Sequence, residues 1–580
     1  MSVLLHLLAV GLRPYARSVA AISVLQLVQI TAMLYLPTLN ADGINHGVLA
    51  GDTGYVLRTG GVMLGVTLVQ MTCAAAAVYV SARTAMALGR DLRAQVFARV
   101  QTFSVREVGR FGAASLITRT TNDVQQIQTL VVLVFTLVVA APVMGAGALV
   151  MAVRLDAPLS VLLVVVLPVL TVAMGVIFGR QMPLSASLQQ RVDRVTKVVR
   201  EQITGIRVVR AFVRDRYEQE RFAEVNRDLL EVGLRLGRMQ ALGMPTAMLI
   251  MEFSGIAVLW FGGHRVDGGG MQAGTLIAFL QYLTQILQAV MMAMMAFLLS
   301  PRASVCATRI REVLNTSSSL TLPASPVTEL REAGRLELRG VGFRYPGAEE
   351  PVLRGVSLTA RPGQTVAVVG STGSGKTTLL HLIPRLFDAT EGQVLAGGTD
   401  VREVDRATLA ATVGLVSQKP YLFSGTIAST LRYGRPEATD DELWKALQTA
   451  QARDFVQALP EGLDAPVAQG GSNLSGGQRQ RLAIARVLLA RPDVYLFDDS
   501  FSALDAATDA RLRVALAEQT AGATVVIVAQ RVATVRHADR IVVLDEGRVE
   551  GSGTHSELMD ASPTYREIVL SQMTAEEAAV

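Results

Sequence analysis

Six long apolar segments precede residue 300, and they limit what this chain of 580 residues can fold into more than any other feature. A helix that crosses the hydrocarbon core of a bilayer needs about 20 mostly apolar residues, and each segment is close to that length or longer. We therefore predict six membrane-spanning helices. They lie roughly at residues 18–39, 56–82, 130–153, 159–178, 244–261 and 273–299.

The connections between these segments alternate in character. Those after the second and fourth segments are long, helical in pattern and rich in arginine, as in "ARTAMALGRDLRAQVFARV" and "REQITGIRVVRAFVRDRYEQERF". Cytoplasmic loops of membrane proteins carry an excess of Lys and Arg. We therefore expect both long connections, the N-terminus and the rest of the chain beyond the bundle on the cytoplasmic side. The first residues, "MSVLLHLLAVGLRPYAR", are expected to form an interfacial helix rather than a cleaved signal.

The pattern changes after the last apolar segment. Residues 316–334 are small, polar and proline-bearing, which is typical of a linker. From residue 335 to 580, short β-rich runs such as "QTVAVVG", "VYLFDD" and "TVVIVAQ" alternate with helical segments, which predicts an α/β domain around a largely parallel sheet. The predicted organisation is a membrane domain at 1–315, a linker and a soluble domain. With only Cys73 and Cys306, no disulfide framework or CxxC metal site is expected.

The stretch "GSTGSGKTT" follows the apolar strand "TVAVV" and precedes a helical segment. It fits the phosphate-binding pattern G-x-x-x-x-G-K-[ST], in which backbone amides and a helix N-terminus face an anion. We expect its lysine to contact the β- and γ-phosphates and the threonine after it to bind Mg²⁺. The predicted nucleotide-binding residues here are Gly370, Ser371, Thr372, Gly373, Ser374, Gly375, Lys376, Thr377 and Thr378.

A second carboxyl-bearing motif ends the apolar strand "VYLFDD". Asp498 is the first of its two aspartates, and a carboxylate at a strand end suits a magnesium ligand. Alone, such a residue is often only a polar strand end, but the phosphate-binding pattern makes the metal assignment persuasive. We therefore expect Thr377 and Asp498 to serve one magnesium ion.

The stretch "NLSGGQRQRLAIARVLLARPDVYLFDD" resembles the signature of ATP-binding cassette (ABC) proteins. The resemblance implies that ATP is sandwiched between the phosphate loop of one subunit and the LSGGQ of another. It also implies that "GRFGAASLITRTTNDV" and "GIRVVRAFVRD" are the two intracellular loops of the ABC exporter fold (type IV), and that the chain is one half of a dimeric transporter. The additional nucleotide-site residues that it implies are Tyr345 for adenine, Gln418 for nucleotide and metal, Ser475, Gly476, Gly477 and Gln478 of the signature, and Asp505 of the "SALD" loop.

Two positions depart from the family pattern. Asp499 stands where the family usually has a glutamate that orients the attacking water, and Gln530 stands where it usually has a histidine. A base displaced by about 1 Å can lose roughly 10²-fold in rate. Together the departures are similar to the degenerate half of heterodimeric exporters, whose partner half supplies the glutamate and histidine. The alternatives are a mainly regulatory half that binds ATP and gates a catalytic partner, and a homodimeric lipid or fatty-acid transporter.

The membrane segments indicate a hydrophobic or amphipathic cargo, such as a drug, lipid or fatty acid. Glu252 lies inside the fifth segment, where a carboxylate is a candidate for substrate contact but could equally make an interhelical hydrogen bond. Candidate thioether contacts are Met248, Met251, Met291 and Met295, for which ordinary packing is the alternative.

The expected location is a bacterial plasma membrane, with lipids as further partners. The family resemblance favours export, and the sequence leaves import open. Nucleic acid is not an expected partner, because the arginines cluster in loops beside the apolar segments. The six apolar segments also argue against a soluble ATPase such as a repair cassette.

Overall fold

The computed structural model describes residues 2–572 and, within them, the side chains of all but residues 2 and 295–301. Contacts divide the chain into two compact units. One comprises Met1–Gln101 and Ala113–Thr316, and the other comprises Thr102–Gly112 and Ser317–Val580. The short segment that follows residue 101 therefore belongs with the C-terminal unit.

The first unit is helical. In the described part of the chain, six helical stretches are long and apolar enough to cross a membrane, which confirms the six-helix prediction. Its elements are α1 (Ser2–Gly11), η1 (Arg13–Tyr15), α2 (Ala16–Asp42), η2 (Gly43–Val48), α3 (Thr53–Gln101), α5 (Ala113–Thr118), η3 (Arg119–Asp123), α6 (Val124–Leu133), η4 (Val134–Val138), α7 (Ala140–Leu155), α8 (Ala157–Thr204), α9 (Ile206–Ala211), α10 (Asp215–Asp267) and α11 (Ala273–Asn315).

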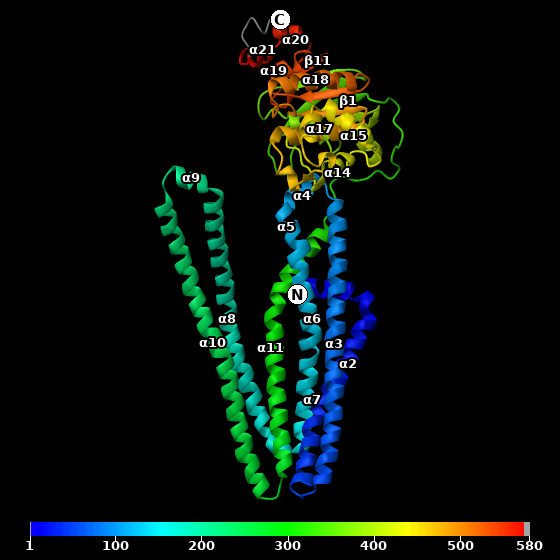
Figure 1. The fold of residues 1–580 in the computed structure, drawn as a ribbon. Coiled ribbons are helices and arrows are strands. Elements are labelled where there is room, and N and C mark those ends of the chain that lie inside the picture. Colours follow the sequence, from blue (N-terminus) through cyan, green and yellow to red (C-terminus); the bar gives the residue numbers. More distant parts are fainter. Residues whose placement is uncertain (1, 573–580) are drawn as a thin grey trace. The chain divides into compact units, whose positions relative to one another are not determined.

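Long antiparallel pairs organise this unit. Helix α2 packs along α3, and α8 packs along α10 with the short helix α9 at the tip of their hairpin (Figure 1). Helix α11 packs on α7 and α2, and an apolar cluster built around Phe279 and Tyr282 of α11 fills the space between α7, α8 and α11. The turn between α7 and α8 is fixed by Asp156, which caps α8 and accepts two hydrogen bonds from Arg265 of α10.

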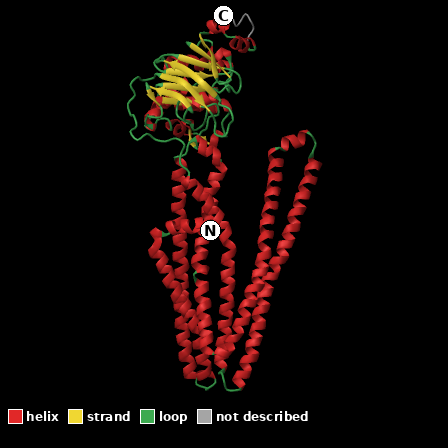
Figure 2. Cartoon of the chain, turned by 180° about the vertical axis from the view of Figure 1, so that it is seen from behind, coloured by secondary structure: helices red, strands yellow, loops and turns green. Residues whose placement is uncertain are grey.

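The second unit is the α/β domain that the alternation of strands and helices in the sequence predicted. Figure 2 shows its strands in yellow. A six-stranded sheet has the order β12-β11-β3-β10-β9-β6, a four-stranded sheet has the order β2-β1-β4-β5, and β7 pairs with β8. The strands are β1 (Leu336–Phe343), β2 (Leu353–Ala360), β3 (Thr365–Val369), β4 (Glu391–Ala396), β5 (Thr399–Asp400), β6 (Val413–Val416), β7 (Gly425–Thr426), β8 (Pro466–Val467), β9 (Val494–Asp498), β10 (Thr524–Val528), β11 (Arg540–Asp545) and β12 (Arg548–Gly553).

Helices complete this unit around three apolar clusters. The central strands β3, β9 and β10 are almost wholly buried, as expected of parallel strands covered on both faces. The helices are α4 (Val105–Phe111), α12 (Lys376–Leu382), α13 (Arg406–Thr412), α14 (Ile427–Arg432), α15 (Asp440–Thr449), α16 (Arg453–Gln457), η5 (Gly462–Asp464), η6 (Gln469–Gly471), α17 (Gly476–Ala490), α18 (Ala506–Gln519), α19 (Val532–Val535), α20 (His555–Ala561) and α21 (Pro563–Leu570).

The segment with linker composition is held against the second unit. The backbone of Val327 bridges Glu403 and Asp405, donating to the first over 2.9 Å and accepting from the second over 2.9 Å. Further along, the amide of Glu332 donates to the carbonyl of Gly397 over 3.2 Å. Small polar composition favours an irregular path, but backbone groups on that path still find partners on a neighbouring sheet edge.

Candidate functional site

Four of the predicted motif segments leave the six-stranded sheet at one edge. Strands β3, β10, β9 and β6 are parallel neighbours, and Val528 at the end of β10 pairs with Val368 of β3 and Asp498 of β9. The carboxyl ends of parallel strands meet at the same edge of a sheet, where ligands of such folds bind. The phosphate loop, the aspartate pair, the segment of Gln530 and that of Gln418 are therefore neighbours.

The glycines of the phosphate loop are required for two reasons, close backbone approach at Gly370 and left-handed backbone at Gly373 and Gly375. A Cβ at Gly370 would lie 2.0 Å from the carbonyl oxygen of Leu544. Gly373 and Gly375 have φ angles of 89° and 99°, in the left-handed region that glycine adopts without a steric cost. The loop ends in the N-terminus of α12, whose amides and dipole favour negative charge.

Lys376 lies under this loop, only 9% exposed. Its Nζ donates to the carbonyl oxygens of Gly370 over 2.9 Å and Ser371 over 2.6 Å, so its partners are neutral. Burial lowers the pKa of Lys376, while the charges of Asp499 and Asp498 oppose that shift. The buried cation of Lys376, whose hydrogen-bond partners are neutral, therefore fits a phosphate group bound by the glycine-rich loop.

Thr377 and Asp498 meet as the sequence predicted. The Thr377 hydroxyl donates to Oδ1 of Asp498 over 2.9 Å, and Asp498 is 2% exposed. Burial raises the pKa of the Asp498 carboxyl, and the hydrogen bond from Thr377 opposes that effect. A hydroxyl and a buried carboxylate side by side form an oxygen donor set that fits a magnesium ion.

Asp499 adopts a left-handed backbone with a φ of 46°. Its amide donates to the carbonyl of Val528 over 2.9 Å, and its Oδ2 accepts from Nε2 of Gln418 over 3.2 Å. Aspartate tolerates this backbone region better than most residues. The carboxylate of Asp499 is therefore held toward the segment of Gln418.

Gln530 is an exposed residue two positions after β10. Its carbonyl oxygen accepts from Nε2 of Gln572 over 2.7 Å, while Oε1 of Gln572 accepts from the amide of Val532 over 2.9 Å. Sequence reasoning missed Gln572, because a lone glutamine near the C-terminus carries no motif. The side-chain amide of Gln572 therefore holds the backbone at two points, the carbonyl of Gln530 and the amide of Val532.

Tyr345 lies close to α12. Its hydroxyl is 3.1 Å from Oγ1 of Thr378, and its ring meets Phe343 and Phe387 edge-on with centroid distances of 4.9 and 5.7 Å. The partly buried ring is thus placed beside the phosphate loop, where the resemblance expects an aromatic residue for adenine.

The signature residues form a capped helix start of their own. The Ser475 hydroxyl accepts from the amide of Gln478 over 3.2 Å, and Oε1 of Gln478 accepts from the amide of Ser475 over 2.9 Å. Gly477 approaches the loop before α18, since a Cβ there would lie 3.2 Å from the carbonyl of Ala503. Asp505, next in that loop, caps α18 by accepting from the amide of Thr508 over 2.9 Å.

These residues are not joined to the chain's own phosphate loop. Among the described residues, no hydrogen bond links 475–478 to 370–378. The helix of the signature is instead joined to the segment of Gln418. Gln480, which the sequence did not single out, is 2% exposed and donates to the carbonyl of Ser417 over 3.4 Å. Its place two residues beyond the signature was the available signal.

The candidate substrate residues are divided between two environments. Met251 and Met291 both pack against the apolar cluster of α7, α8 and α11. Glu252 and Met248 of α10 are exposed in the single chain. The side chain of Met295 lies outside those that the structure describes. Met251 and Met291 thus border the same apolar cluster, and the role of all five residues in binding cargo stays a prediction.

Comparison with known proteins decides the family. Residues 19–290 match the ABC transporter transmembrane region, and residues 353–502 match the ABC transporter family. An uncharacterized ABC transporter ATP-binding protein of Mycobacterium tuberculosis is 50% identical over 98% of this chain and 98% of its own length. The chain belongs to the ABC transporter family. That membership indicates an ATP-hydrolysing transporter and implies ATP with Mg²⁺ generally.

Other relatives carry more specific names. A multidrug efflux ATP-binding/permease protein of Mycobacterium tuberculosis is 36% identical over 85% of this chain and 41% of that protein. An ATP-dependent lipid A-core flippase of Chromobacterium violaceum is 31% identical over 82% of this chain and 82% of that protein. The structure of a bacterial Atm1-family ABC exporter with ATP bound has a TM-score of 0.80 at 23% identity, covering 96% of this ABC transporter and 98% of that chain. This likeness confirms the exporter fold.

Proposed function

We propose that this ABC transporter is one half of a heterodimeric exporter of hydrophobic or amphipathic compounds, and that the site on its own phosphate loop hydrolyses ATP slowly. The observation that carries the proposal is the environment of Asp499. Its side chain is one methylene shorter than glutamate, and Oδ2 is already engaged by Gln418 over 3.2 Å. A general base must lie within hydrogen-bond reach of the water that it orients.

The other predicted site residues of this chain are suited to binding ATP. Bound Mg²⁺–ATP supplies the scissile phosphate bond and the charge that polarises it. Lys376 and the loop amides would hold the phosphates, Thr377 and Asp498 would hold the cation, and Tyr345 would contact the adenine. Gln530 can donate a hydrogen bond but has no imidazole that could carry a proton-linked charge.

A second subunit is supported by two features. The ABC family resemblance implies that a nucleotide is held between the phosphate loop of one subunit and the signature of another, and residues 475–478 make no hydrogen bond to the described phosphate loop of their own chain. Helix α9 also has no buried residue, and Phe212 and Val213 directly after it are 73% and 81% exposed. Exposed apolar residues at the tip of a long hairpin suit an interface with a partner.

Hydrophobic cargo is supported by the relatives that are named for multidrug efflux and lipid A-core flipping. Helix α10 exposes large apolar side chains, among them Met248, Phe253 and Trp260, which a hydrophobic cargo could contact. Glu252 lies on the same exposed stretch and would meet a cationic headgroup or amine.

The test is the ATPase rate of the purified chain in lipid nanodiscs. The chain alone is expected to hydrolyse ATP slowly, and the double variant Asp499→Glu with Gln530→His is expected to be faster. Asp499→Asn serves as the matched loss-of-base control. Brisk turnover of the unmodified chain that Asp499→Asn abolishes would contradict the slow-site proposal, because it would make Asp499 a competent base.

A further inference from the structure

A largely buried arginine three residues beyond the phosphate-loop helix holds a segment of the linker. Arg385 follows α12, and its side chain is 9% exposed. Its Nη2 donates to the carbonyl of Thr321 over 2.8 Å, its Nη1 to the carbonyl of Arg402 over 3.2 Å, and its Nε to Asp388 over 2.8 Å. One guanidinium thus joins three separate segments, which its planar fork of donors allows.

The backbone of Arg385 makes this arrangement more informative. Its φ is 54°, in the left-handed region that costs a residue with a Cβ roughly 1 kcal/mol or more. The amide nevertheless bonds back to the carbonyl of Leu382 over 3.2 Å, so the turn closes the end of α12. Glycine would be the inexpensive residue here for the backbone alone. An arginine at this position adds the hydrogen bonds of its guanidinium, which offset the cost of the left-handed backbone.

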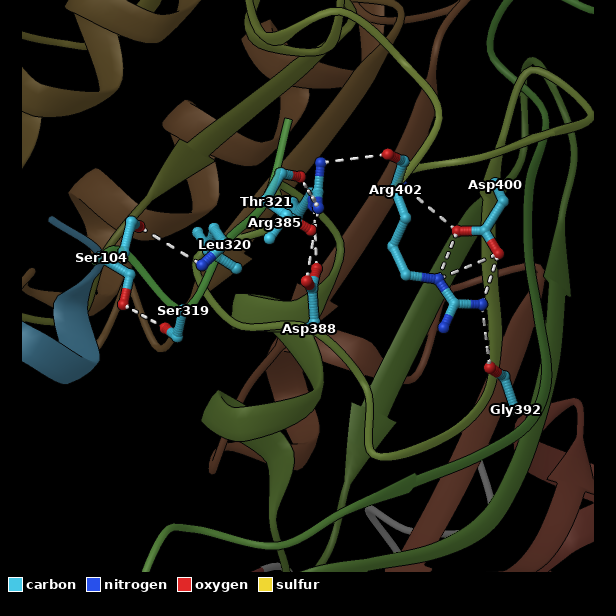
Figure 3. A network of polar contacts seen from close by, with 10 residues as sticks. Ser104, Ser319, Leu320, Thr321, Arg385, Asp388, Gly392, Asp400 and Arg402 are labelled. Carbon is cyan, nitrogen blue, oxygen red and sulfur yellow. Dashed lines mark hydrogen bonds and ion pairs between the residues drawn. The ribbon is translucent and has the colours of Figure 1, made fainter. Parts of the chain in front are cut away.

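The same linker segment is held at its other end by the start of α4. We call residues 318–321 the strap. The hydroxyl of Ser319 lies 2.9 Å from that of Ser104, the N-cap of α4, and the Ser104 hydroxyl also donates to Glu107 over 2.6 Å. Figure 3 shows Ser319 beside Ser104 on one side of the strap and Arg385 beside Thr321 on the other.

A continuous chain of contacts therefore runs from α12 to α4. It passes from the end of the phosphate-loop helix to Arg385, then to the strap at Thr321, and from Ser319 to the capping box of α4. Helix α4 lies between α3 and α5 along the chain, so its position is covalently tied to the ends of two membrane-unit helices. Networks of hydrogen bonds and charged contacts are one physical route for energetic coupling between sites, and coupling along this one is what the experiment below measures.

We propose that Arg385 is a positioning residue that couples the phosphate loop to helix α4 through the strap. When the loop binds nucleotide, α12 and the turn of Arg385 adjust together, and the strap passes that adjustment to Ser104. The proposal requires that the loop binds nucleotide, and it does not require that hydrolysis there is slow. Among the described residues, the side-chain hydrogen bonds and ion pair of Arg385 reach Thr321, Arg402 and Asp388 and none of the predicted nucleotide ligands, so we expect it to act on α4 and not on the bound phosphate.

The experiment measures hydrogen exchange of the α4 amides in the full chain, with and without ATP in Mg²⁺-free buffer, while ATP affinity is measured separately. In the unmodified chain, ATP is expected to change the exchange of residues 105–111 by about fivefold or more, the lower end of ordinary coupling. Arg385→Gln is expected to bring that ratio close to one, with ATP affinity changed by about twofold at most. Ser319→Ala breaks the other end of the strap and is expected to do the same.

Two controls separate coupling from local folding. Asp388→Asn removes the ion pair but leaves the donors to Thr321 in place, so the ratio should persist. Arg339→Gln removes a surface pair with Glu337 and should also leave it intact. Since Arg385 and Ser319 lie on one path, the double variant should be no worse than either single one.

The opposite outcomes would overturn the proposal. They are an unmodified chain that binds ATP without any change at α4, a Ser319→Ala or Arg385→Gln chain that keeps the full ratio, or an Asp388→Asn chain that loses it as completely. If Arg385→Gln does not fold, Ser319→Ala alone decides. A chain that binds no ATP would instead contradict the nucleotide-site assignment.

Discussion

Gln418 and Asp499 come from neighbouring parallel strand ends and join their side chains by a hydrogen bond of 3.2 Å between Nε2 and Oδ2. This contact places the second aspartate of the pair toward the Gln418 segment, while Asp498 beside it bonds to Thr377. Adjacent carboxylates thus face different partners. The division follows from the left-handed backbone at Asp499, which turns the chain sharply after β9.

That backbone predicts an order of stability among substitutions at residue 499. Asp499→Asn should leave the local stability within about 0.5 kcal/mol, because asparagine tolerates a positive φ. Asp499→Ala should destabilise the segment after β9 by roughly 1 kcal/mol, the ordinary cost of a left-handed Cβ. Hydrogen exchange of residues 494–505 in nucleotide-free protein measures both. Equal protection in the two variants would mean that the turn is not strained.

The phosphate loop predicts unequal effects of two similar glycine substitutions. Gly370→Ala places a Cβ 2.0 Å from the backbone oxygen of Leu544 and cannot be accommodated without moving β11. Gly373→Ala meets no heavy atom within 4 Å and suffers only from its φ of 89°. Binding of a fluorescent ATP analogue should therefore weaken by about tenfold or more in Gly370→Ala and by less in Gly373→Ala. The reverse order would contradict the loop geometry.

The capping box of α4 predicts a pH dependence. Although burial opposes it, hydrogen bonding from Ser104 and Ser319 leaves the pKa of the Glu107 carboxyl below its ordinary value of 4.5. A carboxyl with a lowered pKa stabilises the fold above its unfolded pKa, and that contribution is lost as pH falls through the folded pKa. Protection of the α4 amides, corrected for intrinsic exchange, should therefore fall on acidification below about 4.5.

The control for this behaviour is Glu107→Gln, whose amide oxygen can still accept from Ser104 in the capping box at neutral pH. The same variant should show little loss on acidification, because it has no carboxyl to titrate. An unchanged acid response in Glu107→Gln would assign the effect to another group.

The turn between α7 and α8 predicts that a substitution at Asp156 lowers the stability of the protein. Its side chain is 5% exposed, caps α8 and pairs with Arg265 over 2.9 Å. Asp156→Asn should therefore lower the stability of the detergent-solubilised protein by roughly 1–3 kcal/mol. Glu231→Gln, which breaks the exposed pair with Arg235, should change it by about 0.5 kcal/mol or less. Thermal unfolding of the two variants side by side measures the difference.

Sequence patterns predicted the elements whose signals are local. Five of the six apolar segments lie within the membrane-length stretches, and the sixth, 273–299, lies within α11. The length of an apolar run can be counted in the sequence and compared with the fixed thickness of a bilayer. The phosphate loop and the aspartate pair could likewise be predicted from the sequence, since each consists of consecutive residues at a strand end. Contacts made by isolated residues could not be predicted from the sequence. Gln480, Gln572 and Arg385 carry no motif, and each has a partner at least 40 residues away in the chain, Ser417, Gln530 and Thr321 respectively.

The amino-acid order alone determined that this ABC transporter has six membrane helices, a phosphate loop followed by a helix, and a shortened second carboxylate at residue 499. Only the tertiary structure decided where that carboxylate is directed, which residues hold the Gln530 segment, and that the linker is tied to α4 and to the end of α12. The reason is physical. Hydropathy and motif spacing act over a few consecutive residues, whereas a side-chain hydrogen bond depends on two backbone positions that the packed sheet brings within about 3 Å.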